Sequence, residues 1–271
     1  MSDFSQHITN LALTELGSSS KGNKHLNNTL RLLAKWRSTL IQNTLIKEEG
    51  TVVKQGLVAG LDFVENSSEG CHIAKLLGCY EQPLQPYISE LISRQYDNLV
   101  NIGCAEGYYA VGLARLLPNT KSYAYDTDPK ARDACRALAI KNRVSDRVTI
   151  GELFTPEDFK KYEGTNTLVF CDIEGAERDL LDPIVSPALK TIDIIVESHE
   201  CLTPGITEEL ISRFSTTHAI TQVNDNGSRN LDKMPSWFTN LAHLDQILGT
   251  WEWRSGPTPW LVMTAYLGVE T

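Results

Sequence analysis

Short apolar runs alternate with helical segments over the last two thirds of the chain. Apolar residues recur every three to four positions at 108–117, 129–142 and 236–248, and a further helix follows Thr203-Pro204. Seven apolar runs predict strands, at 99–103, 122–126, 147–150, 167–172, 192–197, 219–223 and 260–266. Because strands and helices alternate, the predicted fold class is α/β, with a seven-stranded, mostly parallel, doubly wound sheet.

Residues with strong positional preferences mark several of the helix ends. Pro118 stops the first of these helices, whereas Asp128 is placed to cap the next one, with Pro129 in its first turn. The stretch Thr155-Pro156-Glu157-Asp158 has the pattern of a capping box, with proline at the first helical position. These signals support the helices that the periodicity predicts.

The N-terminal part predicts a helical extension. Helices are expected at 2–16 and 24–48 around a flexible joint at 18–23, followed by a short hairpin at 51–65 and a helix at 84–95. We therefore divide the chain into an N-terminal segment, 1–77, and a catalytic domain, 78–271. The apolar stripe of the second helix predicts packing against the main domain or another copy of the chain, which allows a homo-oligomer; a lid over the substrate is the alternative.

Composition indicates the cellular compartment and excludes some classes of partner. No apolar run approaches the roughly 20 residues that span a bilayer, and the N-terminus has no signal-peptide pattern, so a cytoplasmic protein without a membrane partner is expected. The net charge of -9 repels a phosphate backbone and disfavours nucleic acid. The six cysteines contain no Cys-x-x-Cys pair, which argues against structural zinc and for free thiols.

A glycine turn carries the first sign of function. Asn101-Ile102-Gly103-Cys104-Ala105-Glu106-Gly107 follows an apolar pair, and Asp126 ends the next apolar run. Glycines admit close backbone approach, and a carboxylate at a strand end can accept hydrogen bonds from ribose hydroxyls. Ala105 stands where a dinucleotide fingerprint needs glycine, which disfavours an NAD-linked dehydrogenase. The wider turn favours a nucleoside that carries an amino acid, such as S-adenosylmethionine.

Four motifs together resemble the Rossmann-like S-adenosylmethionine-dependent methyltransferases, and most closely those of the FkbM type. They are the turn at 101–109, Tyr125-Asp126-Thr127-Asp128-Pro129, Phe170-Cys171-Asp172-Ile173-Glu174-Gly175-Ala176-Glu177 and Ile194-Ile195-Val196-Glu197-Ser198-His199. The resemblance covers about residues 78–200. It implies that the last strand is antiparallel, that the turn wraps the methionine part, that Asp126 holds the ribose and that Asp172 lies beside the reacting centre.

The resemblance also implies a set of cofactor-binding residues. Asn101 departs from the family, which usually has an acid there, but its amide oxygen can still accept a hydrogen bond. The expected cofactor is S-adenosyl-L-methionine, and its expected contacts are Asn101, Gly103, Cys104, Gly107, Asp126, Thr127 and Asp172.

Transfer of a methyl group to a hydroxyl requires alignment of donor and acceptor and a base. His199 is the candidate base because it follows the fifth strand at the edge where α/β sheets bind ligands; the alternative is a histidine that bonds only its own loop. Asp172 and Glu174 are the other candidate catalytic residues. They can hold the cofactor, orient the acceptor, or bind a divalent cation with Glu197, His199 or Glu200, although no dedicated spacing marks a metal site and none is expected.

Four residues are candidates for binding the acceptor. Tyr80 and Glu81 precede the first strand and are expected to fold over the pocket, although a solvent-facing turn explains them equally well. Arg229 lies in a polar loop after the sixth strand and can grip a carboxylate or a sugar hydroxyl. Trp260 belongs to a cluster of aromatic and charged residues that can stack on a planar or sugar substrate, with core packing as the alternative.

The predicted function is S-adenosylmethionine-dependent methylation of a small molecule or glycan, most simply at a hydroxyl. The Asn-Pro-Pro-Tyr motif of enzymes that methylate base amino groups is absent, as are nucleophile elbows and phosphate loops. The alternative is a non-catalytic protein that binds the cofactor and serves as a partner or regulatory module through its N-terminal helices.

Overall fold

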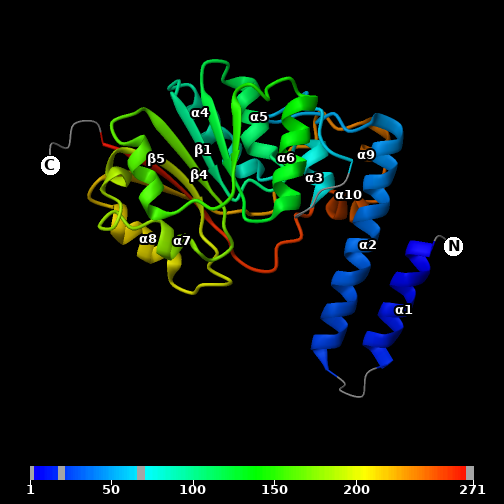
Figure 1. The fold of residues 1–271 in the computed structure, drawn as a ribbon. Helices are drawn as coiled ribbons and strands as arrows, with labels where there is room; N and C mark the ends of the chain where they lie inside the picture. The colour runs from blue at the N-terminus through cyan, green and yellow to red at the C-terminus, as the bar shows by residue number, and fades with distance from the viewer. Residues whose placement is uncertain (1–2, 18–21, 66–70, 267–271) are drawn as a thin grey trace.

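The sheet confirms the predicted fold class. A computed structural model describes residues 3–17, 22–65 and 71–266. Within them, one sheet has the strand order β3-β2-β1-β4-β5-β7-β6 (Figure 1). The strands are β1 (Asn98–Ile102), β2 (Lys121–Tyr125), β3 (Val148–Gly151), β4 (Thr167–Cys171), β5 (Asp193–Glu197), β6 (His218–Val223) and β7 (Trp260–Ala265). Strands β1 to β5 pair in parallel, and β7 is antiparallel to both β5 and β6, as the resemblance implied.

Alternate residues of the central strands enter two separate hydrophobic clusters, one on each face of the sheet. In β4, Leu168 and Phe170 belong to one cluster, whereas Val169 and Cys171 belong to the other. This follows from the two-residue period of a strand. Because both faces are covered, the strands read as unbroken apolar runs in the sequence, which is why they were predictable.

Helices cover the two faces unequally. One face carries α3 (His72–Leu77), α4 (Gln85–Ile92), α5 (Tyr108–Leu116) and α6 (Pro129–Lys141), and the other carries α7 (Glu177–Leu180) and α8 (Ile206–Phe214), with the 3-10 helices η2 (Pro156–Tyr162) and η3 (Pro187–Thr191) (Figure 1). Side-chain caps hold some of them as predicted: Asp128 accepts the backbone N–H of Lys130 at 2.9 Å, and Thr155 and Asp158 form the capping box of η2.

One local prediction was wrong, and two predicted elements are shorter than expected. The predicted helix at 236–248 is two helices, α9 (Ser236–Thr239) and α10 (His243–Thr250), because Ala242 is extended and the Gln246 side chain bonds the carbonyls of Thr239 and Leu241 at 2.9 Å each. The predicted short hairpin at 51–65 has one antiparallel bridge, between Val52 and Asp62, with backbone hydrogen bonds from Val53 to Leu61 and from Phe63 to Thr51 on either side. The predicted helix at 84–95 is α4 preceded by the short η1 (Gln82–Leu84).

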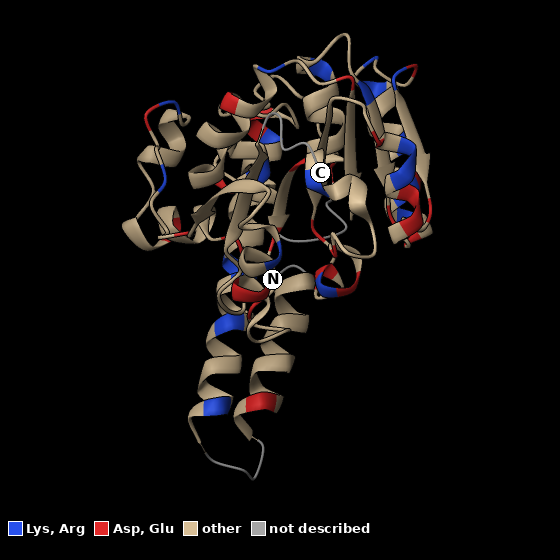
Figure 2. Ribbon diagram, turned by 90° about the vertical axis from the view of Figure 1, so that its left-hand side faces the viewer, with Lys and Arg blue, Asp and Glu red and all other residues tan. Residues whose placement is uncertain are grey.

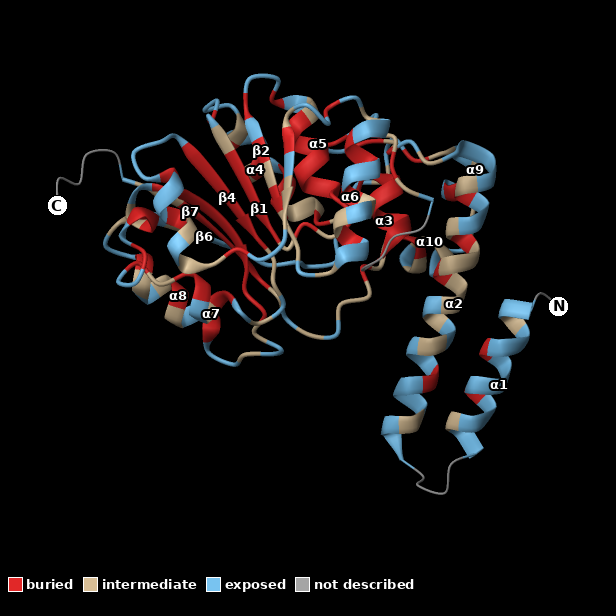
Figure 3. Ribbon diagram, viewed as in Figure 1, coloured by how far each residue is buried: buried red, intermediate tan, exposed pale blue. Residues whose placement is uncertain are grey.

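The N-terminal extension forms a helical hairpin that extends away from the sheet. It consists of α1 (Asp3–Gly17) and α2 (Asn23–Glu49) (Figures 1 and 3). Only the second half of α2 joins the main core, through Ile41 and Leu45. That core also contains residues from both sides of position 78, and the division of the chain there stays a prediction. Across the described residues, no helix has the length and apolar character needed to cross a membrane.

Candidate functional site

The glycine turn after β1 lies against the carboxyl end of β4. Gly103 has φ +76°, and a Cβ atom there would lie 1.6 Å from the carbonyl oxygen of Asp172, so only glycine fits. Gly107, with φ +94°, similarly lies close to Cys135, whose Sγ would be 2.7 Å from an added Cβ. The two glycines therefore let the turn pack closely against Asp172 and Cys135.

Asp126, at the end of β2, holds the same turn in place. One carboxylate oxygen accepts the backbone N–H of Ala105 at 2.9 Å, and the other accepts that of Asp128 at 2.9 Å. Each oxygen has further lone pairs, and the side chain lines a cavity. Asp126 can thus position the turn and still accept hydrogen bonds from a ligand.

A cavity of about 350 Å³ lies at the carboxyl ends of β1, β2, β3 and β4. Five of the sequence-predicted site residues line it, together with an apolar wall that suits a planar base. The predicted residues are Gly103, Asp126, Thr127, Asp172 and Glu174, and the apolar ones include Phe154, Ile173 and Leu180. We call this cavity the nucleoside pocket.

The other three predicted cofactor residues lie outside the lining of the nucleoside pocket. Asn101 is buried, and its side-chain N–H donates to the carbonyl of Phe170 at 3.3 Å. Cys104 is also buried, and Gly107 is the N-cap of α5. All three stand in or beside the turn, and direct contact between them and a cofactor stays a prediction.

A second cavity, of about 300 Å³, adjoins the first. Asp172 and Glu174 line both cavities, so the two meet at these carboxylates. The second cavity is lined by titratable residues from three further parts of the chain, with Tyr80 and Trp253 as aromatic walls: Lys75, Glu197 and His199, and Glu252 and Arg254. We call it the acceptor pocket.

His199 is held in the acceptor pocket by a buried carboxylate. Its Nδ1 lies 2.6 Å from Oε1 of Glu177, and its Nε2 lies 3.5 Å from Asp172 and 3.6 Å from Glu197. Burial lowers the pKa of His199, but the hydrogen bond to Glu177 and the charge of Glu197 outweigh it, so the pKa is raised above its ordinary value. Because the Nδ1 hydrogen bond fixes the ring, Nε2 faces the two carboxylates.

Asp172 and Glu197 bring two carboxyl groups together beside His199. Burial, together with the charges of Glu197 and Glu81, raises the pKa of Asp172 well above its ordinary value. A carboxyl group that keeps its proton can donate it to a neighbouring carboxylate. Among the described residues, Asp172, Glu197 and His199 are also the group whose ligand atoms lie close enough to hold a metal ion, all within 4.8 Å. Glu200 instead caps the start of α8, accepting the N–H of Gly205.

Arg254 links the acceptor pocket to the residues predicted to bind substrate. Its guanidinium donates to Glu197 and, at 2.8 Å, to Glu81. Glu81 also accepts the hydroxyl of Tyr109 at 2.5 Å. Burial raises the pKa of Glu81 to about 8, against the opposing effect of Arg254. Glu81 therefore lies behind the pocket wall, whereas Tyr80 lines the pocket itself.

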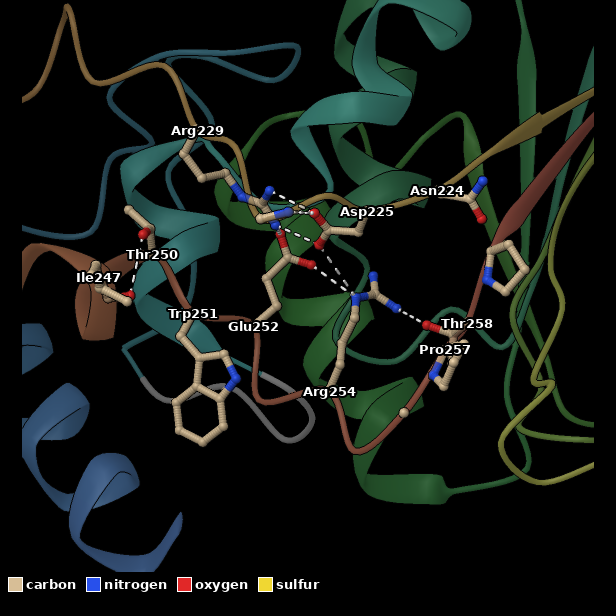
Figure 4. A pocket seen from close by; sticks show the side chains of 13 residues that line it. Asn224, Asp225, Arg229, Ile247, Thr250, Trp251, Glu252, Arg254, Pro257 and Thr258 are labelled. Carbon is tan, nitrogen blue, oxygen red and sulfur yellow. Dashed lines mark hydrogen bonds and ion pairs between the residues drawn. The ribbon is translucent and has the colours of Figure 1, made fainter. Parts of the chain in front are cut away.

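A third and larger hollow, of about 500 Å³, lies on the far side of Arg254 (Figure 4). Arg229 lines it but is bound to Asp225 at 2.7 Å and to Glu252, with its side chain only 4% exposed. Glu252 connects both arginines, since Arg254 donates to it at 3.1 Å. The hollow and the acceptor pocket share Glu252, Arg254 and Thr258, so the two adjoin at this ion-pair network.

Trp260 lies in the core, 4% exposed, with its ring 5.0 Å from that of Phe170. It lines none of the three cavities described above. Its contact with an acceptor stays a prediction, and so does a direct contact of Arg229.

The sequence did not indicate the partners of three residues that shape the site. Glu177 orients His199, Arg254 neutralises Glu197 and Glu81, and Lys75 pairs with Glu106 of the turn at 2.6 Å. Glu177 stands inside the most specific motif of the resemblance, so its position carried a signal. Lys75 lies 31 residues from Glu106 in the sequence, and Arg254 lies 57 residues from Glu197. No spacing in the sequence indicates either pair.

Comparison with known proteins gives only distant structural matches. No family model matches the chain, and a search of curated proteins found no match. An O-methyltransferase from Bacillus cereus, solved in complex with SAH, is 14% identical over 69% of this chain and 81% of its own, with a TM-score of 0.44. The O-methyltransferase TomG from Streptomyces achromogenes, in complex with SAM, is 13% identical over 68% and 79%, with a TM-score of 0.45. The human methyltransferase 10 domain containing protein is 12% identical over 87% and 98%, with a TM-score of 0.47.

Proposed function

We propose that the protein is an S-adenosylmethionine-dependent methyltransferase of the FkbM type that methylates a hydroxyl group of a small molecule or glycan. The observation that carries the proposal is the meeting of two cavities at Asp172 and Glu174. One cavity offers an apolar wall and the carboxylate of Asp126, and the other offers His199 held by a buried carboxylate. Donor and acceptor would therefore face each other at the ends of β4 and β5.

The residues of the nucleoside pocket fit the cofactor. Phe154, Ile173 and Leu180 would contact the adenine ring, and Asp126 would accept hydrogen bonds from the ribose, with Thr127 beside it. The turn from Gly103 to Gly107 would hold the methionine part of the cofactor. Asn101, Cys104 and Gly107 would fix the shape of this turn. When bound, the sulfonium supplies an activated methyl group.

His199 would take the proton of the acceptor hydroxyl on Nε2 as the oxygen bonds to the methyl carbon and the bond from that carbon to the cofactor's sulfur breaks, with S-adenosylhomocysteine as the leaving group. The Glu177 carboxylate stabilises the resulting imidazolium across the 2.6 Å contact at Nδ1. Asp172 and Glu174 lie between the two cavities and would orient donor and acceptor. Tyr80 would contact the acceptor, whereas Glu81 and Arg229 would act by holding Arg254 and Glu252 in place.

Cofactor binding is tested by calorimetry with S-adenosylmethionine and S-adenosylhomocysteine. Loss of hydrogen bonds to a charged group at about 1.5–3 kcal/mol predicts that Asp126→Ala weakens binding by about 10- to 150-fold. Glu152→Gln, which alters an exposed carboxylate on the same cavity, is the matched control and should bind normally. Failure of the native chain to bind either compound would remove the proposal. Binding without turnover on a broad panel of hydroxyl acceptors would favour the non-catalytic module instead.

The role of His199 is tested by separating turnover from affinity. His199→Ala should lower kcat by about 10²- to 10⁴-fold and leave cofactor affinity nearly unchanged. Since the base must be neutral, kcat should rise with pH through a pKa above 6.5. Glu177→Gln removes a charge that raises this pKa and should move the profile to lower pH. Unchanged turnover in His199→Ala, or an unmoved profile in Glu177→Gln, contradicts the assignment.

We propose that the transfer needs no metal ion. Arg254 already supplies a positive charge to Glu197, and Nε2 of His199 is then available to the acceptor. Activity should survive exhaustive treatment with a chelator. Loss of activity that Mg²⁺, Mn²⁺ or Zn²⁺ restores would instead assign Asp172, Glu197 and His199 as metal ligands.

We also propose a cytoplasmic setting, without membrane or nucleic-acid partners. The free thiols of all six cysteines suit a reducing compartment. The net charge of -9 disfavours binding to a phosphate backbone.

A further inference from the structure

The projecting helical hairpin exposes a broad apolar surface. On α2, Leu26, Leu30 and Leu33 follow one another at helical spacing and therefore share one face. They are 61%, 66% and 42% exposed. Leu13 and Leu16, at the same end of the hairpin on α1, are 64% and 51% exposed. We call these five residues the leucine face.

The hairpin gains little from its own packing. In α1 only Ile8 and Ala12 are buried, and neither belongs to the two hydrophobic clusters of the sheet. Neither cluster contains any residue before Ile41. Figure 3 shows α1 and the first half of α2 as mainly exposed. Hydrogen bonds join the two helices, between Glu15 and both His25 and Asn28 and from Trp36 to Ser5, but few apolar side chains are buried between them, so a further partner would add stability.

The leucine face is large enough for a specific interface. The five exposed fractions correspond to roughly 500 Å² of surface, which is in the range of the largest apolar patch of a typical protein, a patch that is often functional. A standard interface buries about 800 Å² per partner, including its polar rim. The leucine face would supply the apolar centre of such an interface.

The charges of the hairpin identify the partner. Asp3 and Glu15 on α1 are acidic, and this helix has no lysine or arginine. The first half of α2 carries Lys24, Arg31 and Lys35 and no acid. Figure 2 shows the two helices with opposite charge colours. A surface with one acidic and one basic helix is complementary to itself when α1 of one copy lies on α2 of the other.

We propose that the protein is a homodimer in which the leucine faces of two copies pack together as a four-helix bundle. Four helices around an apolar core are stable where two are not. The arrangement is isologous, so each copy contributes the same leucines to the interface. The catalytic sheets lie outside the bundle, since the hairpin extends away from them (Figure 1). Dimerisation is therefore separable from cofactor binding.

Sedimentation equilibrium of the full chain from 1 to 100 µM tests the proposal. The native chain should have twice the mass of the 30.2 kDa monomer. The double variant Leu26→Glu/Leu30→Glu places four charges in the bundle core of a dimer and should be monomeric. A matched control, Ile184→Glu/Val185→Glu, adds the same charges at sites 87% and 61% exposed near the sheet and should stay dimeric.

Two outcomes overturn the proposal: a native chain that is monomeric at 100 µM, or a dimer that persists in Leu26→Glu/Leu30→Glu. Cofactor affinity and thermal unfolding of the main domain are measured on each variant. Both should match the native values, because the leucine face lies outside the sheet clusters. If the monomeric variant also loses its main unfolding transition, Leu33→Glu alone, at the edge of the face, replaces it and should weaken the dimer at least tenfold.

Discussion

Replacing Lys75 with methionine should destabilise the protein by about 3–5 kcal/mol, the usual cost of removing one member of a buried ion pair. The Lys75 Nζ lies 2.6 Å from Oε1 of Glu106, and the two side chains are only 6% and 0% exposed. The lysine also lies over the ring of Tyr80, 5.1 Å from its centre. With an unfolding entropy of roughly 2.1 cal/mol/K per residue, the loss corresponds to a fall in Tm of about 5–9 °C.

The assay is denaturant unfolding combined with cofactor calorimetry. The double variant Lys75→Met/Glu106→Gln removes both charges of the pair, so much of the lost stability should return. Because Glu106 belongs to the glycine turn, the single variant should also bind S-adenosylmethionine more weakly. Arg136→Met is the control: its 2.7 Å contact with Asp133 is as short, but the side chains are 54% and 79% exposed. Equal losses in Lys75→Met and Arg136→Met would refute the reasoning from burial.

Two further predictions concern the turn and the response to acid. Gly103→Ala should abolish cofactor binding and lower Tm, because the new Cβ meets the carbonyl oxygen of Asp172. The control Gly164→Ala has a similar φ of +71° but no atom within 4 Å of the new Cβ, so it should be only mildly destabilised. Burial lowers the pKa of His72 to about 4 in the folded protein. Below pH 6.5 the unfolded chain therefore binds a proton at His72 that the folded protein does not. The free energy of unfolding should fall by up to about 3 kcal/mol as the pH drops from 6.5 to 4. In His72→Gln the urea-unfolding free energy should fall less steeply over that range, and an identical slope would contradict the assignment.

Most of the sheet was predictable because its strands are buried on both faces. Runs such as Thr167–Cys171 and Asp193–Glu197 have almost no polar interruption, and the helices between them begin and end at recognisable residues. Helix α3 was missed for a related reason. All six of its residues, His72–Leu77, are buried, so it has no polar face and no amphipathic period. The break between α9 and α10 depends on the Gln246 side chain, which no local preference reveals.

The residues at the strand ends could be placed because topology alone brings them together. Asp126, Asp172 and His199 follow β2, β4 and β5, and parallel strands end at one edge. What the residues bind was not predictable, because it depends on chain segments far apart. Arg229, expected to contact a ligand, is held by Asp225 and Glu252, and Arg254, 173 residues from Glu81, bonds that carboxylate.

The charge balance around Arg254 limits the kind of acceptor that the site can take. Arg229 and Arg254 face a larger number of buried or half-buried carboxylates: Glu81, Asp172, Glu197, Asp225 and Glu252. Burial raises the pKa values of Glu81 and Glu252, so part of the excess is carried as protons. Another anion in the acceptor pocket would add repulsion at low dielectric, whereas a neutral hydroxyl adds none. We infer that the acceptor enters this pocket through an uncharged portion, and that any phosphate or carboxylate it carries stays outside.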